Sequence, residues 1–319
     1  MKVIFADTAH ASLMERLTSA GFSCSLAEGL NEANAHMVLS QAEGIVIRSK
    51  IKLTAELLDQ LPGLRFIARV GAGMENIAVE YAAARGIRCL HAPEGNRNAV
   101  AEHALGMLLA LMNNLIRADR EVRQGIWLRE QNRGHELAGR TIGLIGYGNT
   151  GAAFAKRLAG FDVKILAYDK YKTGFSSHQV QESSMNEIFE HADVLSLHVP
   201  LADDTRNLVN IDLLGKFKKP VYLINTSRGP CVDTFGLLEA LDKGIVAGAA
   251  LDVLEFESTS FESVKSVPDV YKRLFASEKV ILSPHIAGWT FESNQRMADI
   301  LFEKIMQLRL LPDIGNRTD

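Results

Sequence analysis

Residues 137–169 read LAGRTIGLIGYGNTGAAFAKRLAGFDVKILAYD, and this stretch decides the fold of the chain around it. The apolar run TIGLI leads into Gly146-x-Gly148-x-x-Gly151, a helical pattern follows, and a second apolar run ends at Asp169. Glycines at these positions allow a tight turn, close approach of the backbone to a pyrophosphate, and close packing of helix on strand. The unpaired N–H groups that begin the helix suit an anion. The stretch therefore predicts a β–α–β unit that binds a dinucleotide.

The acid that ends the second run favours NAD over NADP. Asp169 lies 18 residues after Gly151, close to the spacing of ~20 at which a carboxylate binds the ribose hydroxyls. That charge would repel a 2′-phosphate, although Lys170 and Lys172 follow it and weaken the preference. FAD and S-adenosylmethionine proteins share the turn, and a glycine turn can also be purely structural, so these alternatives stay open here.

Apolar segments alternate with amphipathic stretches along the whole chain, which is typical of parallel sheets covered by helices. The segments are KVIFAD, GIVIR, LRFIAR and IRCLHA before residue 98, and TIGLIG, VKILAYD, DVLSLH, VYLINTS, VAGAALDV and VILSP after residue 140. Between the two sets, residues 98–122 predict one long helix with a broad apolar face, which marks a domain boundary. A last helical pattern, at about residues 291–311, must pack back on an existing domain to bury its stripe. We expect an α/β protein of two domains.

Composition excludes several classes of protein. The 35 Lys and Arg against 38 Asp and Glu give a net charge of −3, which leaves no basic surface for nucleic acid or an anionic membrane. The longest apolar run, residues 104–112, is far shorter than the ~20 residues of a membrane span. The N-terminus has no signal-peptide pattern, and Cys24, Cys89 and Cys231 lack metal-ligand spacing. We expect a cytoplasmic protein without a metal.

Three further segments follow predicted strands, where open parallel sheets bind their ligands. They are residues 225–229 (NTSRG), 250–257 (ALDVLEFE) and 283–288 (SPHIAG). Arg228 can bind a carboxylate with two parallel hydrogen bonds, and His285 can exchange a hydroxyl proton near neutral pH. Glu257 can hydrogen-bond His285 and stabilise its charged form. Each residue alone is more often structural or solvated, but together, behind a dinucleotide unit, they predict hydride transfer on a 2-hydroxy acid.

With the glycine turn, these segments resemble the D-isomer-specific 2-hydroxyacid dehydrogenases, which include phosphoglycerate dehydrogenase, glyoxylate/hydroxypyruvate reductases and D-lactate dehydrogenase. VIRSKIKLT, IARVGAGMENI, GNRNAVAEHALGMLLAL and LHVPL also match, so the resemblance covers nearly the whole chain. It implies a flavodoxin-like substrate domain formed by residues 1–98 and 286–319, and an NAD-binding Rossmann domain at residues 99–285. It further implies a homodimer that interconverts a D-2-hydroxy acid and its 2-keto acid with NAD.

The resemblance also implies the site residues. The catalytic set is Arg228, Glu257 and His285. The NAD contacts are Gly146, Tyr147, Gly148, Asn149, Thr150, Gly151, Asp169, His198, Val199, Pro200, Thr205, Thr226, Asp252, which faces the nicotinamide end, and Gly288. The substrate contacts are the backbone N–H groups of Gly71, Ala72 and Gly73, with Ser49 and Asn96 nearby, and Arg48 and Lys50, which resemble the basic pair that meets phosphate in phosphoglycerate dehydrogenases.

Several features separate the alternatives within this resemblance. Glu257 favours hydroxy-acid chemistry, because formate dehydrogenases of this fold have Gln there. It is followed by Ser-Thr-Ser in place of the usual Pro, and Trp289 replaces a small residue, either as packing or as a wall of the substrate pocket. The apolar helix from residue 98 is either a dimer interface or core. An NAD-sensing co-repressor with little turnover, or an enzyme that oxidises phosphite, remains an alternative function.

Overall fold

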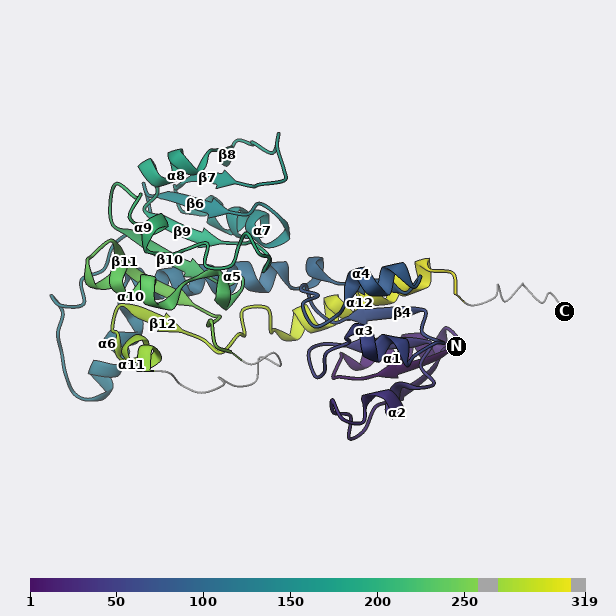
Figure 1. The fold of residues 1–319 in the computed structure, drawn as a ribbon. Coiled ribbons are helices and arrows are strands. Elements are labelled where there is room, and N and C mark those ends of the chain that lie inside the picture. The colour runs from purple at the N-terminus through teal and green to yellow at the C-terminus, as the bar shows by residue number, and fades with distance from the viewer. Residues whose placement is uncertain (258–268, 311–319) are drawn as a thin grey trace. The chain divides into compact units, whose positions relative to one another are not determined.

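The computed structural model describes residues 1–257 and 269–310 and divides the chain into two compact units. One unit comprises Met1–Asn96 and Trp289–Asp319, and the other comprises Arg97–Gly288. Each unit is built on a parallel sheet with helices packed on both faces, which confirms the expected α/β class (Figure 1).

The first unit has a five-stranded sheet in the order β2-β1-β3-β4-β5, which is the flavodoxin-like order. Its strands are β1 Lys2–Phe5, β2 Ser23–Leu26, β3 Gly44–Ile47, β4 Phe66–Arg69 and β5 Arg88–His91. On one face lie α2 (Ala35–Leu39), α3 (Ala55–Asp59) and α4 (Val79–Ala84), and on the other lie α1 (Ala11–Ser19) and α12 (Phe291–Gln307).

Helix α12 joins the end of the chain to the unit that begins it. Its buried residues Met297, Leu301 and Ile305 pack in one cluster with Val3 and Phe5 of β1. The apolar stripe of this last helix is thereby covered, as a single helix requires.

The second unit has a seven-stranded parallel sheet in the order β12-β11-β10-β9-β6-β7-β8. Its strands are β6 Thr141–Ile145, β7 Lys164–Tyr168, β8 Val180–Glu182, β9 Val194–Leu197, β10 Val221–Asn225, β11 Val246–Leu251 and β12 Val280–Leu282. Its helices are α5 Pro93–Met112, which begins in the first unit, α6 Leu115–Arg123, α7 Asn149–Arg157, α8 Met185–His191, α9 Ile211–Leu214, α10 Thr234–Asp242 and α11 Asp269–Ala276, with 3₁₀ turns at Leu158–Gly160 and Gly229–Cys231. Strand order reverses between β6 and β9, and open α/β sheets bind ligands beyond the carboxyl ends of strands at such a reversal.

The long helix expected over residues 98–122 is wrong in its bounds. The structure ends α5 at Met112 and starts α6 at Leu115, because Asn114 adopts a left-handed φ of 54° that a continuous helix cannot contain. The apolar face of α5 belongs to the core: Ala104, Leu108 and Met112 cluster with residues of β6 and α7. Helix α6, in contrast, buries none of its residues.

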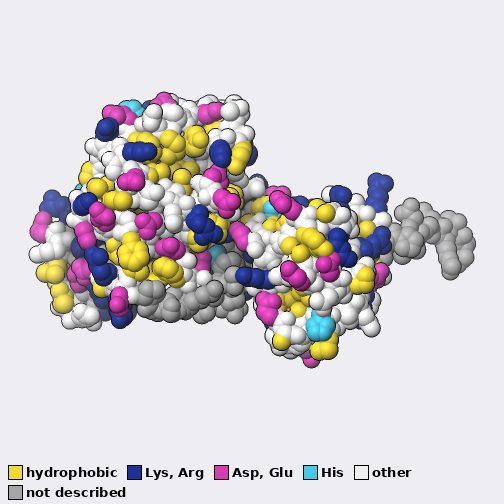
Figure 2. All heavy atoms as spheres, in the orientation of Figure 1, with side chains coloured by type: hydrophobic (Ala, Val, Ile, Leu, Met, Phe, Trp, Pro, Cys, Tyr) yellow, Lys and Arg dark blue, Asp and Glu magenta, His cyan; other side chains and the backbone are white. Residues whose placement is uncertain are grey.

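Acidic and basic side chains are interspersed on the face drawn in Figure 2. Within the described residues, no single helix is long and apolar enough to cross a membrane; α5 and α6 reach that length and apolarity only as a pair, bent by 62°. No group of three or more His, Cys, Asp or Glu side chains is placed to hold a metal in residues 1–257 and 269–310.

Candidate active site

The glycine turn joins β6 to α7 at the reversal of strand order. Gly146 has φ 94°, and a Cβ there would lie 2.5 Å from the carbonyl oxygen of His198. A Cβ on Gly151 would lie 2.2 Å from the carbonyl oxygen of Gly146. A Cβ on Gly148 would have no neighbour within 4 Å, and Gly148 gives α7 no side-chain cap. The first and third glycines are therefore needed by the fold, whereas the second leaves open space at the start of a helix, where an anion fits.

The Asp169 carboxylate is held by backbone N–H groups just beyond β7. It accepts hydrogen bonds from Tyr147 (2.7 Å), Tyr171 (2.9 Å) and Lys172 (3.0 Å). Burial pushes the pKa of Asp169 up, but these bonds and the Lys172 charge outweigh it, so the net shift is downward. Lys170 pairs with Asp204, and the Lys172 ammonium donates to the Tyr147 carbonyl oxygen (3.2 Å). The ionised carboxylate therefore stays next to the glycine turn.

Two buried polar atoms near this turn have no hydrogen-bond partner. Nδ1 of His198, just after β9, and Oγ1 of Thr226, just after β10, are both of this kind. The other ring nitrogen of His198 lies 3.0 Å from Oγ of Ser196, and burial lowers the pKa of His198 to about 3, so the ring is neutral. Because a buried polar atom without a partner costs about 1–3 kcal/mol, both positions suit a polar ligand. The turn, Asp169 and these atoms fit a bound dinucleotide.

The other cofactor positions expected from the sequence lie on the same strand ends. Asn149 and Thr150 form the first turn of α7, and Val199 and Pro200 follow β9. The Thr205 hydroxyl donates to the Pro200 carbonyl oxygen (2.7 Å) and accepts from the Ala202 N–H (2.7 Å), so it closes the loop after β9.

His285 and Glu257 form a pair beyond the ends of β12 and β11. Nδ1 of His285 lies 3.0 Å from Oε2 of Glu257, and the side chains are 21% and 15% exposed. His285 has a left-handed φ of 56°, which is uncommon for a residue with a Cβ. The contact leaves Nε2 of His285 as the ring nitrogen not bound to Glu257, which suits proton exchange with a ligand.

Glu257 is positioned by two contacts of the segment that precedes it. The Phe256 N–H donates to the hydroxyl of Tyr271 on α11 (2.9 Å), and the Thr234 hydroxyl donates to the carboxylate of Glu255 (2.9 Å). Sequence reasoning missed Tyr271, which is fully buried, because no motif contains it.

Asp252, expected to face the nicotinamide, binds the turn that carries His285. It is 2% exposed, and its backbone oxygen accepts from the His285 N–H (2.8 Å). Its carboxylate accepts from the N–H groups of Ile286 (2.9 Å) and Ala287 (2.8 Å).

Arg228 follows β10, the strand beside β11. Nη1 of Arg228 donates to the Ser227 carbonyl oxygen (2.7 Å), and the Asn225 side chain donates to the Arg228 carbonyl oxygen (2.9 Å). A Cβ on Gly229 would lie 2.0 Å from the Leu254 carbonyl oxygen, so the residue after Arg228 packs on the segment that leads to Glu257. The structure thus brings His285 and Glu257 into contact and places Arg228 at the same edge of the sheet.

The expected substrate residues lie in the first unit, beyond the ends of β3, β4 and β5. The N–H groups of Ser49 (2.8 Å) and Lys50 (3.0 Å) donate to the carboxylate of Asp7, a residue that sequence reasoning missed although it directly follows the first apolar run. Gly71 has φ 148°, and the Ala72 carbonyl oxygen lies 2.6 Å from Nδ1 of His91.

Trp289 packs against Arg48 within the same unit. The guanidinium carbon of Arg48 lies 4.2 Å from the centre of the Trp289 ring, a distance typical of a cation–π contact. Among the described residues, no carboxylate lies within 4.0 Å of Arg48, and Oδ1 of Asn96 is buried without a hydrogen-bond partner.

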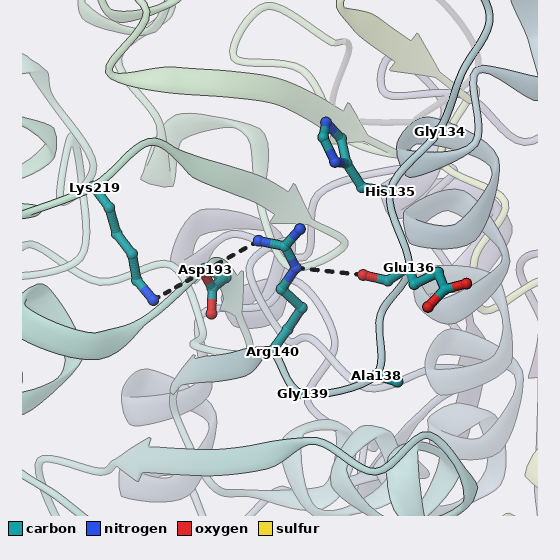
Figure 3. Close-up of a pocket in the computed structure, with 8 residues that line it drawn as sticks. All are labelled: Gly134, His135, Glu136, Ala138, Gly139, Arg140, Asp193 and Lys219. Atoms are coloured by element: carbon teal, nitrogen blue, oxygen red, sulfur yellow. Dashed lines mark hydrogen bonds and ion pairs between the residues drawn. The ribbon is translucent and has the colours of Figure 1, made fainter.

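A polar pocket of about 500 Å³ lies at the amino ends of strands in the second unit. Figure 3 shows the side chains of Arg140 and Lys219 pointing toward Asp193 there. Nη1 of Arg140 lies 3.6 Å and Nζ of Lys219 2.8 Å from the Asp193 carboxylate. These residues precede β6, β10 and β9, so the pocket is remote from the glycine turn and is not the candidate site.

Comparison with known proteins agrees with this geometry. Residues 105–287 match the family model described as "D-isomer specific 2-hydroxyacid dehydrogenase, NAD binding domain". The chain is 35% identical to a hydroxypyruvate reductase of Thermotoga maritima (88% of this chain and 89% of that one) and 41% identical to a glyoxylate reductase of Thermofilum pendens (78% and 73%). A solved D-lactate dehydrogenase from Aquifex aeolicus, complexed with NAD and lactic acid, superposes with a TM-score of 0.83 at 28% identity, covering 96% of this chain and 95% of that one.

Proposed function

The chain belongs to the D-isomer specific 2-hydroxyacid dehydrogenases, which are NAD-dependent oxidoreductases, and from this we propose that Arg228, Glu257 and His285 carry its chemistry. The observation that supports this assignment is the 3.0 Å contact between His285 and Glu257 at the carboxyl edge of the sheet. The alternative of a co-repressor with little turnover is not favoured, because the matching relatives are enzymes.

His285 moves the substrate proton. During reduction of the keto acid, Nε2 gives its proton to the carbonyl oxygen, and during oxidation of the hydroxy acid it takes the hydroxyl proton. The Glu257 carboxylate fixes the orientation of the ring through Nδ1 and stabilises the charged ring. A positioned acid or base of this kind contributes about 10²- to 10⁴-fold in rate. Arg228 binds the carboxylate or carbonyl oxygen of the substrate and stabilises the charge that develops there.

The second unit holds the cofactor. Bound NADH supplies the hydride that reduces the substrate carbon. Gly148 and the first turn of α7 accommodate the pyrophosphate, and Asp169 binds the ribose hydroxyls. The two buried atoms without partners, Nδ1 of His198 and Oγ1 of Thr226, gain hydrogen bonds on binding.

We propose a small anionic 2-keto acid as the substrate. Arg48 supports this class, since Trp289 orients its guanidinium and no described carboxylate neutralises it. The candidates are glyoxylate, hydroxypyruvate and phosphohydroxypyruvate. The N–H groups of Gly71, Ala72 and Gly73, together with Ser49, Lys50 and Asn96, remain the proposed substrate contacts.

A homodimer in the cytoplasm completes the proposal. Six apolar side chains of residues 115–128 are exposed: Leu115, Ile116, Val122, Ile126, Trp127 and Leu128. An exposed apolar patch of this kind supports association. All three cysteines are free thiols, which supports a reducing compartment.

The test is NADH oxidation with glyoxylate, hydroxypyruvate, phosphohydroxypyruvate, pyruvate and phenylpyruvate, repeated with NADPH. We expect turnover with at least one acid and a preference for NADH. His285→Asn should lower kcat by about 10²- to 10⁴-fold and leave NADH binding unchanged. If His285→Asn keeps most of its activity, the assigned chemistry is wrong.

A further inference from the structure

His103, on helix α5, contacts the turn that carries His285 although it belongs to none of the catalytic motifs. Its Nε2 lies 2.9 Å from Oγ of Ser283 and 3.5 Å from Oδ1 of Asp252. Ser283 in turn lies 2.5 Å from the same carboxylate oxygen. His103, Ser283 and Asp252 all belong to the second unit, so their arrangement does not depend on the first.

In the contacts of Ser283 with His103 and Asp252, the donated hydrogen points toward Asp252. Asp252 accepts from two backbone N–H groups and from the Ser283 hydroxyl. Because a hydroxyl has one hydrogen, the Ser283 oxygen is left to accept from the ring N–H of His103. The result is a chain of donors from His103 through Ser283 to the carboxylate.

The hydrogen-bond chain from His103 ends at the buried carboxylate of Asp252. A buried carboxylate is stable only when hydrogen bonds or a positive charge compensate it. Within residues 1–257 and 269–310, no lysine or arginine nitrogen lies within 4.0 Å of the Asp252 carboxylate, whereas Nε2 of His103 lies 3.5 Å from it. Loss of the His103 donor removes a hydrogen bond from Ser283 and leaves the carboxylate less restrained.

The Asp252 carboxylate also fixes the backbone that directly follows His285. Its bonds to Ile286 and Ala287, with the bond from the His285 N–H to the Asp252 backbone oxygen, hold His285 at its left-handed φ of 56°. Since L-residues rarely adopt this conformation unless their surroundings impose it, the direction of the imidazole depends on these bonds.

We propose that His103 is a positioning residue for proton transfer by His285: through Ser283 and Asp252 it fixes the turn that aims the imidazole. The proposal rests on the proposed function of His285. The polar contacts of His103 among the described residues are with Ser283 and Asp252, and neither the glycine turn nor Glu257 is among them.

The test compares two amides of different length at position 103. His103→Gln places an amide nitrogen near the position of Nε2, whereas His103→Asn carries the same group one methylene shorter and cannot reach Ser283. We expect His103→Asn to lower kcat per NADH-binding site by about 10- to 100-fold, the effect of a misplaced catalytic group. We expect His103→Gln to restore kcat to within about threefold of the wild type. NADH affinity and stoichiometry should stay unchanged in both.

Met107→Leu is the matched control. Met107 lies one turn further along α5, and its sulfur lies 3.6 Å from Oγ of Ser283, so the variant changes packing on the same serine without removing the strong donor. It should keep wild-type kcat.

Three outcomes overturn the proposal: wild-type kcat in His103→Asn, no recovery in His103→Gln, or an equal loss in Met107→Leu. The activity of His285→Asn, measured in the same assay, separates failure of the proposed function from failure of the role proposed for His103. An active His285→Asn refutes the proposed function, whereas an inactive one beside a fully active His103→Asn refutes only the role of His103.

Discussion

Gly148 and Gly151 belong to one turn but differ in their surroundings. Space around Gly148 is open, whereas a Cβ on Gly151 meets the backbone oxygen of Gly146 at 2.2 Å. Gly148 has a φ of −89° and a ψ of −149°, so its φ is not in the left-handed region that favours glycine. A substitution at Gly148 therefore tests ligand binding, whereas a substitution at Gly151 tests the stability of the fold.

Gly148→Ala should weaken NADH binding by at least about tenfold, because its methyl group fills the space left for the pyrophosphate. Its melting temperature should match that of the wild type. Gly151→Ala should lower the free energy of unfolding by about 1–3 kcal/mol, because a backbone atom must move to admit the methyl group. Fluorescence titration with NADH and thermal denaturation of both variants measure the difference. A Gly148→Ala protein that binds NADH normally contradicts the assignment of this turn.

His198 should make the protein less stable in acid. The pKa of His198 is about 3 in the folded chain and near 6.5 when unfolded, so below about pH 6.5 only the unfolded chain takes up its proton. Stability is then lost as the pH falls from about 6.5 toward 3, by roughly 3 kcal/mol between pH 7 and pH 4.

Urea unfolding of wild type and His198→Asn between pH 7 and pH 4 tests this. The carboxylates contribute equally to both proteins, so the difference in unfolding free energy between them should shrink as the pH falls. Parallel curves would mean that His198 binds its proton equally well in the folded and the unfolded chain, so that its pKa is not lowered by folding.

At the scale of elements, helix α11 supports the catalytic segment through Tyr271. The Tyr271 hydroxyl accepts from the Phe256 N–H next to Glu257, and burial raises the pKa of Tyr271 to about 12, so the group stays neutral. Tyr271→Phe leaves this N–H without its partner, which should cost about 1–3 kcal/mol in unfolding free energy and lower kcat with little change in NADH affinity.

Tyr222→Phe is the control for Tyr271→Phe. Tyr222 is half-buried on β10, and no hydrogen bond of its hydroxyl is found among the described residues. The same loss of one oxygen should therefore leave kcat unchanged. Equal losses of kcat in the two variants would show that Tyr271 has no specific role.

Sequence patterns predicted all the interior strands and the edge strands β5 and β12, but missed the edge strands β2 and β8. Interior strands such as β3 (GIVI) and β9 (VLSL) are buried throughout and are apolar apart from Ser196 in β9. The edge strand β2 (SCSL) is largely exposed, and the edge strand β8 (VQE) has three residues, so neither carries an apolar run that a pattern can detect.

The same limit applies to the site. His285 and Glu257 lie in motifs and could be predicted. His103 and Tyr271 could not, because their contacts are made across the fold: His103 meets Ser283 across 180 positions of sequence. Such partners are visible only once the sheet has brought the segments together.

At the scale of the whole molecule, the exposed apolar residues of positions 115–128 make the oligomeric state testable. Ile116 is 61% and Trp127 75% exposed. Ile116→Ser combined with Trp127→Ser should weaken self-association by roughly 100-fold or more, because large apolar side chains dominate interface energies. Sedimentation velocity over a range of protein concentrations measures this change.

Leu26→Ser provides the comparison, because Leu26 is similarly exposed but lies on the first unit. It should leave the sedimentation coefficient unchanged. A wild-type chain that sediments as a monomer would refute the homodimer.

Helix α12 completes the first unit but follows the whole second unit in sequence, and this sets the order in which the two units can fold on the ribosome. Strand β5 ends at His91 and α12 begins at Phe291, so 199 residues are translated between them. The second unit has all its strands by then, whereas the N-terminal sheet still lacks the helix that covers Val3 and Phe5. The nascent chain therefore carries an uncovered apolar face until α12 has been translated, and during that interval chaperones can bind it.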